Sequence, residues 1–325
     1  MKVTDKIFIA GHTGLVGGAF FRLLTQKGYT NIITRTSSEL DLRDQLGVRN
    51  FFEAEKPTHV FLAAAKVGGI MANKSYPADF IFDNLSIQNN IIHSSYLNGV
   101  EKLLFLGSSC IYPKNAPQPI IEEYLMSGVL EPTNDAYAIA KIAGIKMCQA
   151  FNKQLGTRFI SAMPTNLYGP GDNYHLQNAH VLPALIRKFH EAKLKSESSV
   201  TVWGTGNPRR EFLHVDDAAM ACYYLMQKYE DSSIINIGSG EDHSIRQLAE
   251  LLKKITGFEG ELIFDENKPD GTLRKLLCVD KINNLGWKYS IPLEEGLRLT
   301  YKEFEKNYLY YINNKDKRYH EFTHV

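Results

Sequence analysis

The stretch Lys6-Ile-Phe-Ile-Ala-Gly-His-Thr-Gly-Leu-Val-Gly17 decides the fold that the sequence predicts. A short apolar strand runs into three glycines at the spacing Gly-x-x-Gly-x-x-Gly, and an amphipathic helix follows. Gly11 permits a tight turn, Gly14 lets backbone N–H groups approach a pyrophosphate at the helix N-terminus, and Gly17 lets helix and strand pack closely. A plain strand-to-helix turn is the alternative. The arrangement predicts a dinucleotide-binding unit.

Strands and helices go on alternating through the first half of the chain. Such alternation predicts a parallel sheet with helices on both faces, which is a Rossmann-like, doubly wound α/β fold. We expect a loop at 70–76 to cover a nicotinamide and a second loop region at 122–132. The expected strands are 31–35, 59–62, 102–106 and 158–163, and the expected helices are 45–55, 77–98 and a helix from about 135 to 155.

Beyond residue 170 the alternation loosens. We expect residues 1–170 to form the dinucleotide-binding domain and 171–325 to form mainly a smaller α/β substrate lobe, with some segments returning to the sheet. The tail 307–318 is expected to be a last helix followed by a loose end. The expected helices of this half start near 180 and span 216–228, 244–256 and 293–305, and its strands are 199–203, 234–236 and 261–264.

Composition excludes several classes of protein. A net charge of +1 gives no basic surface for nucleic acid or membrane, and no apolar run is long enough to span a membrane. The four cysteines are scattered, which fits neither a disulfide framework nor a zinc site, so we expect no metal. Met1 leads within a few residues into the first strand, so we expect no signal peptide and a cytoplasmic location.

The second expected strand ends in Arg35-Thr-Ser-Ser38, without the acidic residue that would bind a ribose diol. A guanidinium and hydroxyls suit a 2′-phosphate, so the sequence favours NADP(H) over NAD(H). Glu39 argues against this preference, and a solvated loop with a chance arginine is the alternative.

Two further stretches carry the candidate chemistry: Leu104-Phe-Leu-Gly-Ser-Ser-Cys-Ile-Tyr-Pro113 and Asp135-Ala-Tyr-Ala-Ile-Ala-Lys141. The first is a strand that ends in hydroxyls and a thiol, and the second places Tyr137 and Lys141 on one face of a helix. This combination resembles the extended short-chain dehydrogenase/reductases. The resemblance implies that Tyr137 protonates a carbonyl oxygen, that Ser108 hydrogen-bonds the same oxygen, and that Lys141 lowers the Tyr137 pKa and holds the nicotinamide ribose.

Within that group the chain resembles the GDP-L-fucose synthases almost from end to end. The resemblance implies a 3,5-epimerase and 4-reductase for GDP-4-keto-6-deoxy-D-mannose, with NADPH as reductant, and a homodimer formed through the helices at 77–98 and 137–155. Its most specific block is Leu106-Gly-Ser-Ser-Cys-Ile-Tyr-Pro-Lys114. The other blocks are Gly11-His12, Ala63-Ala-Ala-Lys-Val-Gly-Gly69, Glu131-Pro-Thr-Asn134, Tyr137–Lys146, Met163–Pro170, His180-Val181, Pro183-Ala-Leu185, Arg210–Asp217 and Lys268-Pro-Asp-Gly-Thr272.

The resemblance also implies roles for individual residues. Cys110 and His180 become the acid–base pair for epimerisation, beside the reductive set of Ser108, Tyr137 and Lys141. The implied cofactor-binding residues are Gly11, Thr13, Gly14, Leu15, Val16, Gly17, Arg35, Ser37, Ser38, Asp41, Leu42, Ala64, Ala65, Leu106, Gly107, Ser108, Tyr137, Lys141, Pro164, Asn166, Leu167 and His180. The implied substrate-binding residues are Ser108, Cys110, Asn166, Val181, Lys188, Trp203, Arg210 and Asp270.

Two positions depart from the family pattern, which has arginine at each. Thr13 removes one candidate contact to the 2′-phosphate, and Lys188 replaces a bidentate fork by a point charge near the diphosphate.

Several of the implied residues have structural alternatives. Cys110 can be a small buried hydrophobic residue, and His180 can be a helix cap with His175 or His214 as the acid instead. Trp203 can belong to the core. Arg210 can pair internally with Glu211 or an aspartate.

Two other functions stay open at this point. One is a C4-reductase, with or without epimerase activity, for a related GDP-4-keto sugar such as a GDP-4-keto-heptose of surface polysaccharide synthesis. The other is a non-catalytic protein that senses NADP, which predicts a broken Ser/Tyr/Lys set; the sequence keeps Ser108, Tyr137 and Lys141. A dehydratase or a UDP-hexose 4-epimerase is disfavoured because Cys110 replaces the residues those reactions usually place after the serine.

Overall fold

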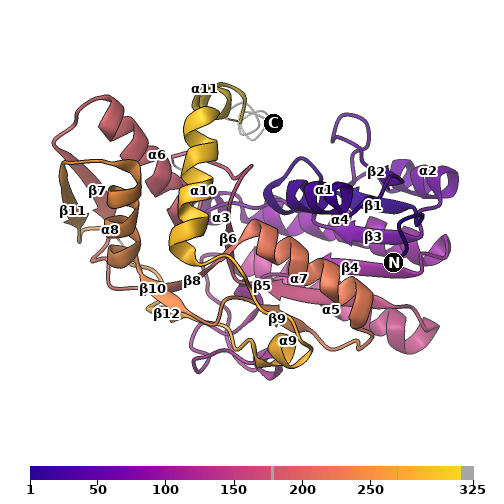
Figure 1. Cartoon of the computed structure of the whole chain (residues 1–325). Helices are drawn as coiled ribbons and strands as arrows, with labels where there is room; N and C mark the ends of the chain where they lie inside the picture. Colours follow the sequence, from indigo (N-terminus) through magenta and orange to yellow (C-terminus); the bar gives the residue numbers. More distant parts are fainter. Residues whose placement is uncertain (177–178, 269, 316–325) are drawn as a thin grey trace.

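The computed structural model describes residues 1–176, 179–268 and 270–315, and it divides into a large sheet domain and a smaller lobe (Figure 1). The elements of the first half, in chain order, are β1 (Ile7–Ala10), α1 (Leu15–Gln26), β2 (Ile32–Ile33), α2 (Gln45–Glu55), β3 (His59–Leu62), α3 (Ile70–Ser75), α4 (Pro77–Leu97), β4 (Lys102–Leu106), the 3₁₀ turns Ser109–Ile111 and Glu122–Tyr124, α5 (Asp135–Leu155), β5 (Phe159–Pro164) and β6 (Asn166–Tyr168).

The second half alternates less regularly. Its elements are α6 (Val181–Leu194), β7 (Ser199–Trp203), β8 (Arg209–His214), α7 (Val215–Lys228), β9 (Ile235–Ile237), β10 (Asp242–Ser244), α8 (Ile245–Thr256), β11 (Glu261–Asp265), β12 (Arg274–Lys275), α9 (Asp280–Asn284), α10 (Leu293–Lys306), α11 (Tyr308–Tyr310) and a π-helical turn, Tyr311–Lys315.

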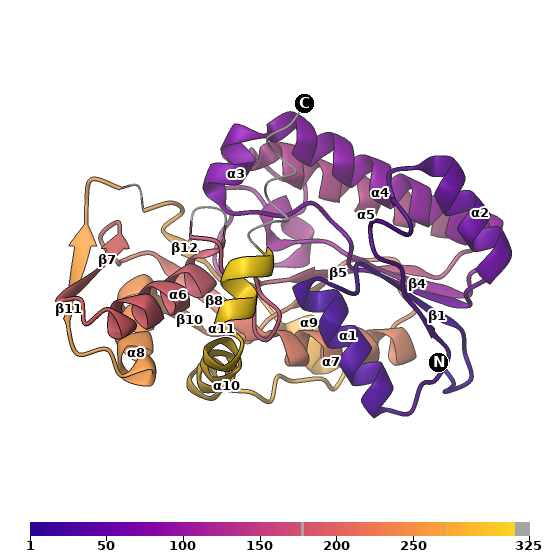
Figure 2. The same cartoon turned by 90° about the horizontal axis from the view of Figure 1, so that it is seen from above.

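Six parallel strands form the central sheet, in the order β2-β1-β3-β4-β5-β9. Helices α1 and α7 cover one face, and α2, α4 and α5 cover the other, as the view from above shows (Figure 2). Strand β4 is therefore buried along its whole length, which explains its continuous apolar run Leu103–Leu106. The predicted fold class, a Rossmann-like doubly wound α/β sheet, is confirmed.

Strand β1 lies between β2 and β3. The chain first adds β2 on one side of β1 and then crosses to the other side to add β3, so the strand order reverses at β1. Ligands of doubly wound sheets bind at the carboxyl ends of the strands beside such a switch point. The glycine loop follows β1 at this edge, and the small residues Ala63–Ala65 follow β3. The topology thus places a dinucleotide cradle at this edge.

The smaller lobe has its own hydrophobic core, built from α6, α8, α10 and the strands β7 and β8. Strand β8 connects its parts, because β6, β10 and β12 all pair with it. Strands β7 and β11 pair separately at the far end of the lobe (Figure 1). Both ends of helix α8 are fixed by residues next to them in the sequence. Ser244 and Gln247 form a capping box at its start, and Gly257 ends the helix in the left-handed conformation.

Several segments beyond residue 170 pack in the core of the large domain. Strand β9 is the sixth strand of the central sheet, and α7 lies against α1. Residues 277–287 also contribute Leu277, Ile282 and Trp287 to this core. The placement of a domain boundary near residue 170 stays a prediction.

Three sequence-based expectations were wrong. Residues 70–76 are not a loop, because α3 forms between Gly69 and Pro77, with the Asn73 side chain donating to the carbonyls of Gly68 and Gly69 at 2.8 and 3.1 Å. The strand expected at 31–35 shortens to β2. Strands β6 and β8 were not expected, because their short, polar sequences carry little strand pattern of their own.

The tail forms the short helix α11 and the π-helical turn up to residue 315. The loose end expected beyond it lies outside the described residues. No helix in the part of the chain described by the structure is both long and apolar enough to cross a membrane.

Candidate active site

The carboxyl end of β4 delivers the first group of candidate residues. Ser108 follows the strand in an extended conformation, and its Oγ accepts a hydrogen bond from the backbone N–H of Cys110 at 3.3 Å. This bond folds residues 109–111 into a single 3₁₀ turn, which brings the Cys110 side chain back beside Ser108. Cys110 is only 6% exposed.

Helix α5 delivers the second group to the same place. Lys141 is 3% exposed, and its Nζ donates to the carbonyl oxygen of Leu106 at 2.8 Å, which ties the helix to the end of β4. Tyr137 lies one turn earlier; the Lys141 Nζ is 5.8 Å from the centroid of its ring. Ser108 also lies close enough to Tyr137 to lower the pKa of its phenol. Ser108, Cys110, Tyr137 and Lys141 therefore lie together at the end of β4, as the resemblance implied, whereas spacing alone predicted only that Tyr137 and Lys141 share a helix face.

The electrostatics of this cluster follow from burial. Burial raises the pKa of Tyr137, and the neighbouring Cys110 raises it further, while Ser108 acts in the opposite direction. Burial lowers the pKa of Lys141 from 10.5 to about 8. Tyr137 is nevertheless partly reached by solvent. A neutral phenol that a substrate can reach can donate a proton to it.

His180 is the residue before α6, where its side chain makes no cap hydrogen bond. It is exposed to solvent, yet enough protein surrounds it that desolvation lowers its pKa. Its rival His214 is fully buried, caps α7 by accepting from the N–H of Asp216 at 3.3 Å, and packs edge-on against Tyr168. That structural role leaves His214 poorly placed for a substrate.

The glycine loop fits a dinucleotide. Gly11 has φ +90°, and a Cβ there would lie 2.7 Å from the N atom of Ala64; a Cβ at Gly17 would collide with the Gly11 carbonyl. Gly14 precedes α1 without a side-chain cap, so the first amides of this helix are available to an anion. Thr13, Leu15 and Val16 complete the turn. Where Ala64 and Ala65 follow β3, the small side chains leave room beside this cradle.

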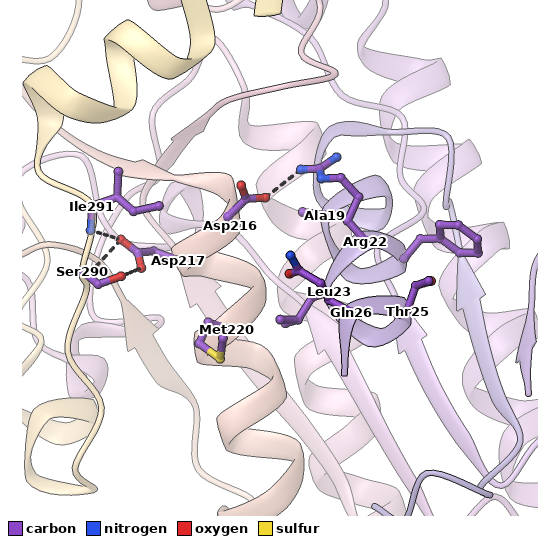
Figure 3. Close-up of a pocket in the computed structure, with 11 residues that line it drawn as sticks. Ala19, Arg22, Leu23, Thr25, Gln26, Asp216, Asp217, Met220, Ser290 and Ile291 are labelled. Atoms are coloured by element: carbon purple, nitrogen blue, oxygen red, sulfur yellow. Dashed lines mark hydrogen bonds and ion pairs between the residues drawn. The ribbon is translucent and has the colours of Figure 1, made fainter. Parts of the chain in front are cut away.

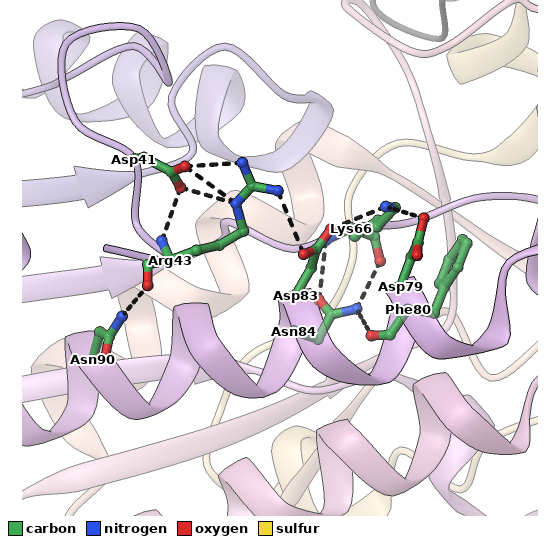
Figure 4. A network of polar contacts seen from close by, with 8 residues as sticks. All are labelled: Asp41, Arg43, Lys66, Asp79, Phe80, Asp83, Asn84 and Asn90. Atoms are coloured by element: carbon green, nitrogen blue, oxygen red, sulfur yellow. Dashed lines mark hydrogen bonds and ion pairs between the residues drawn. The ribbon is translucent and has the colours of Figure 1, made fainter. Parts of the chain in front are cut away.

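A polar network fixes the outer wall of this cradle (Figure 4). Asp41 holds Arg43 through both carboxylate oxygens, and the side-chain amide of Asn90 donates to the carbonyls of Leu42 and Arg43 at 3.0 Å each. Asn84 clamps the backbone N–H and C=O of Lys66, also at 3.0 Å. Sequence reasoning missed Arg43, Asn84 and Asn90, because their contacts join segments that are distant in the sequence.

Arg35 is predicted to contact the 2′-phosphate of NADP(H), and this role stays a prediction. Its guanidinium is 2.5 Å from a Glu55 oxygen, donates to the Thr34 carbonyl at 2.8 Å and lies over the Phe51 ring. These two bonds leave further N–H donors of the Arg35 guanidinium available. Glu39, which argued against this cofactor, instead accepts from the N–H and hydroxyl of Thr36. Ser37 and Ser38 belong to the same turn.

The cradle allows a prediction on cofactor choice. We expect Arg35→Ala to weaken NADPH binding by about 10- to 100-fold, the value of one or two lost charge-assisted hydrogen bonds, and to leave NADH binding unchanged. Titration of each cofactor by fluorescence measures this. Arg49→Ala is the matched control, because Arg49 is an exposed arginine of α2 that forms only an i,i+4 pair with Glu53 among the described contacts. Equal losses for both cofactors would contradict the assignment.

The lobe contributes the candidate substrate residues. Arg210 lies in β8, where burial lowers the pKa of its side chain and Asp270 raises it. Asp270 accepts from the N–H and hydroxyl of Thr205 at 2.8 Å each. Glu211 faces away from Arg210 and accepts from the backbone of Gly240 and Leu277, so the alternative of an Arg210–Glu211 pair is wrong.

Trp203 is 51% exposed, so the alternative of a core residue is also wrong. Lys188 and Lys268 lie beside its ring, with Nζ to centroid distances of 5.4 and 5.6 Å. Lys188 also donates to the Thr201 carbonyl at 3.2 Å. Val181, exposed at the start of α6, opens toward solvent. An exposed indole flanked by two cations suits a flat base that carries phosphates.

The remaining predicted residues lie at the junction between the sheet and the lobe. Pro164 ends β5, Leu167 lies in β6, and the Asn166 side chain donates to the Glu211 carbonyl at 2.8 Å. Gly107 has no room for a Cβ beside Met163. The role of each residue in binding stays a prediction.

Two of the cavities lined by described residues lie outside the catalytic cluster. The larger, of about 680 Å³, is an open groove between α1 and α7; Arg22 pairs with Asp216 across it, and Asp217 binds the backbone of Ser290 and Ile291 (Figure 3). None of the predicted site residues lines it. The smaller, of about 340 Å³, lies between His12–Gly14 and the tail residues Tyr310 and Tyr311. Sequence reasoning did not place the tail beside the glycine loop.

Comparison with known proteins places the chain in a family. The profile of the NAD dependent epimerase/dehydratase family matches residues 7–238. GDP-L-fucose synthase 1 of Arabidopsis thaliana is 60% identical over 302 residues, which is 93% of this chain and 94% of the relative.

Two solved structures extend the comparison. A GDP-L-fucose synthetase from Naegleria fowleri bound to NADP is 31% identical with a TM-score of 0.88, covering 95% of this chain and 96% of that one. A GDP-6-OMe-4-keto-L-xylo-heptose reductase from C. jejuni is 42% identical with a TM-score of 0.91, covering 94% and 99%. The chain belongs to the NAD dependent epimerase/dehydratase family, and within it to the GDP-L-fucose synthases.

Proposed function

We propose that this chain is an NADPH-dependent 3,5-epimerase and 4-reductase that converts GDP-4-keto-6-deoxy-D-mannose to GDP-L-fucose. The observation that carries the proposal is the convergence of Ser108, Cys110, Tyr137 and Lys141 beside the glycine cradle. The GDP-L-fucose synthases at 59–60% identity support this substrate more strongly than the heptose reductases at 41–44% support theirs.

One oxygen-binding site serves both reactions. A ketone at C4 acidifies the protons on C3 and C5, because the electron pair released at either carbon delocalises onto the C4 oxygen. Ser108 and Tyr137 donate to that oxygen, and one such donor contributes about 3–4 kcal/mol to the transition state. Cys110 removes the ring proton as a thiolate, and His180 delivers a proton to the opposite face. The same donors then stabilise the charge that develops on this oxygen during reduction.

The reductive step uses the protonated phenol. NADPH, when bound, supplies a hydride to C4 from the cradle. Tyr137 protonates the C4 oxygen, and Lys141⁺ stabilises the phenolate that remains. Arg210, Lys188 and Asp270 bind the nucleotide diphosphate part of the substrate, and Trp203 stacks on the base. Asn166 and His180 lie by the nicotinamide.

A pH dependence follows from Lys141. Its pKa of about 8 means that the ammonium is present below this pH and is lost above it. We expect kcat/KM for reduction of the 3,5-inverted ketone, which needs no epimerisation, to fall as pH rises through about 8. Lys141→Arg keeps its charge at all working pH values, so its residual activity should lack this decline. A wild-type profile that stays flat to pH 10 would contradict the role of Lys141.

The substrate is tested by turnover. Purified GDP-4-keto-6-deoxy-D-mannose and a GDP-4-keto-heptose are each supplied with NADPH and with NADH, and the products are identified by NMR. The proposal expects GDP-L-fucose from the first substrate, with NADPH preferred. Exclusive turnover of the heptose favours the second candidate, a heptose C4-reductase, for which the structural likeness to the C. jejuni reductase at TM-score 0.91 is the supporting observation.

We also propose a homodimer and a cytoplasmic location. Helices α4 and α5 pack side by side and expose apolar side chains on their outer surface, among them Phe82, Leu97 and Ile139. All four cysteines are free thiols, which suits a reducing compartment. Phe82→Glu is expected to give a monomer by light scattering after gel filtration, whereas Leu46→Glu, equally exposed on α2, should leave the dimer intact. A wild-type monomer would refute this assembly.

A further inference from the structure

The C-terminal segment of the chain lies across a cavity from the glycine loop. This cavity, of about 340 Å³, is lined by residues 12–14 of the loop and by Tyr310 and Tyr311 of the tail. Residues 170 and 171, which come shortly after β6, line it as well. The view from above shows α11 next to the start of α1 (Figure 2). The sheet domain therefore supplies one wall of the cavity, and the end of the chain supplies another.

Tyr311 fixes the end of the chain at this place. Its side chain is 4% exposed, and its hydroxyl donates to Glu303 at 2.6 Å and accepts from the backbone N–H of Gly171 at 3.1 Å. Its ring packs against Tyr174 and Phe304, with centroid distances of 4.7 and 5.9 Å. These buried contacts join the tail to α10 and to the loop after β6, so the position of α11 over the cavity is set by the lobe core.

Tyr310 has no comparable role in packing. Its ring meets only the edge of the Tyr311 ring, at 5.8 Å, and its side chain is 52% exposed. Tyr308 and Tyr311 belong to the lobe core, whereas Tyr310 is not among the described residues of that core. Leu309, on the same turn, is even more exposed and does not line the cavity. Tyr310 is thus an aromatic side chain that lines the cavity and that the fold itself does not need.

The residues across the cavity from Tyr310 suit a diphosphate. Gly14 precedes α1 without a side-chain cap, so the first amides of this helix are available, and their partial positive charge favours an anion. Arg22 lines the same cavity and adds a guanidinium, which is paired with Asp216 at 2.7 Å. A dinucleotide whose diphosphate rests on the glycine loop would therefore have Tyr310 on its other side.

We propose that Tyr310 is a cofactor-binding residue whose ring covers the diphosphate of the bound dinucleotide opposite the glycine loop and slows its release. The identity of that dinucleotide as NADP(H) rests on the proposed function. Tyr311 is the positioning residue, because it holds Tyr310 over the cavity through Gly171 and Glu303. The last described turn of the chain thereby belongs to the cofactor site, although it lies about 300 residues after the glycine loop in the sequence.

The test measures cofactor binding to the full chain without any sugar. The Kd of NADPH is obtained by fluorescence titration, and its release rate by stopped-flow displacement with excess NADP⁺. Tyr310→Ala is expected to raise both by about fivefold, the value of partly burying one aromatic ring against the cofactor. Tyr310→Phe keeps the ring and should bind within about twofold of wild type. Leu309→Ala is the matched control and should leave both values unchanged.

Tyr311→Phe tests the positioning role. It removes the hydroxyl that binds Gly171 and Glu303 and should speed release as well. A melting temperature near that of wild type shows that each variant is folded. Wild-type release in Tyr310→Ala overturns the proposal, and so does an equal acceleration in Leu309→Ala or in Tyr310→Phe. A wild-type protein that binds neither NADPH nor NADH would instead refute the proposed function, and this inference with it.

Discussion

Replacing Tyr137 by Phe should reduce the rate of ketone reduction by about 10²- to 10⁴-fold, the usual contribution of a positioned general acid. The substitution removes one hydroxyl and keeps the ring that packs edge-on against Phe80 at 6.2 Å, so the fold should be unaffected. The burial-raised pKa of Tyr137 keeps the phenol protonated at neutral pH, which is the form the reaction needs. Oxidation of NADPH with the 3,5-inverted ketone measures the effect without the epimerisation steps.

Tyr229→Phe is the matched control. Tyr229 follows the last residue of α7, and its buried hydroxyl binds only Ser233 among the described contacts. This control should turn over at the wild-type rate. Exchange at C3 and C5 should also slow in Tyr137→Phe, since the enolate oxygen loses one of its two donors. Unchanged reductase turnover in Tyr137→Phe would remove the central residue from the mechanism and would favour a non-catalytic role for the fold.

Replacing Cys110 by Ser should abolish epimerisation while leaving reduction largely intact. A serine hydroxyl is a far weaker acid than a thiol, so the base that removes the C3 and C5 protons is lost, and we expect exchange to fall by about 10²-fold or more. Ser108, Tyr137 and Lys141 keep their contacts, so reduction of the 3,5-inverted ketone should stay within a few-fold of wild type. Deuterium uptake at C3 and C5, read by NMR without NADPH, measures the first effect.

Cys278→Ser is the control for this variant, because Cys278 is half-buried away from the cluster and should exchange normally. Two results would contradict the assignment. Retained exchange in Cys110→Ser would make another residue the base, and an equal loss of exchange and reduction would mean that Cys110 acts only by shaping the cleft.

Local sequence patterns were enough to predict most of the first half of the fold. The glycine loop predicted the β1–α1 cradle, where a side chain at Gly11 or Gly17 would collide with neighbouring backbone. The i,i+4 spacing of Tyr137 and Lys141 predicted that both would face the end of β4, since helical geometry alone fixes that relation. The apolar run within 102–106 predicted a short strand, and the structure buries this strand along its whole length.

The rest depended on pairings between distant parts of the chain. Strand β9 joins the sheet next to β5, and β8 gathers β6, β10 and β12, yet each of these strands is too short to show a periodicity. Gly69 and Pro77 flank α3, and Asn73 lies within it. The helix has only six residues, which are too few to show a helical period, so the sequence predicted a loop there. Glu55 beside Arg35 is a tertiary relation that no local spacing encodes. The tail beside the glycine loop is a second such case.

The most direct test follows the wild-type enzyme with GDP-4-keto-6-deoxy-D-mannose and NADPH in deuterated water, with NMR of the product. The account predicts GDP-L-fucose that carries solvent deuterium at both C3 and C5 and none at C4. A reduced sugar with protium at C3 and C5, still in the manno configuration, would show a reductase without epimerisation and would contradict the account.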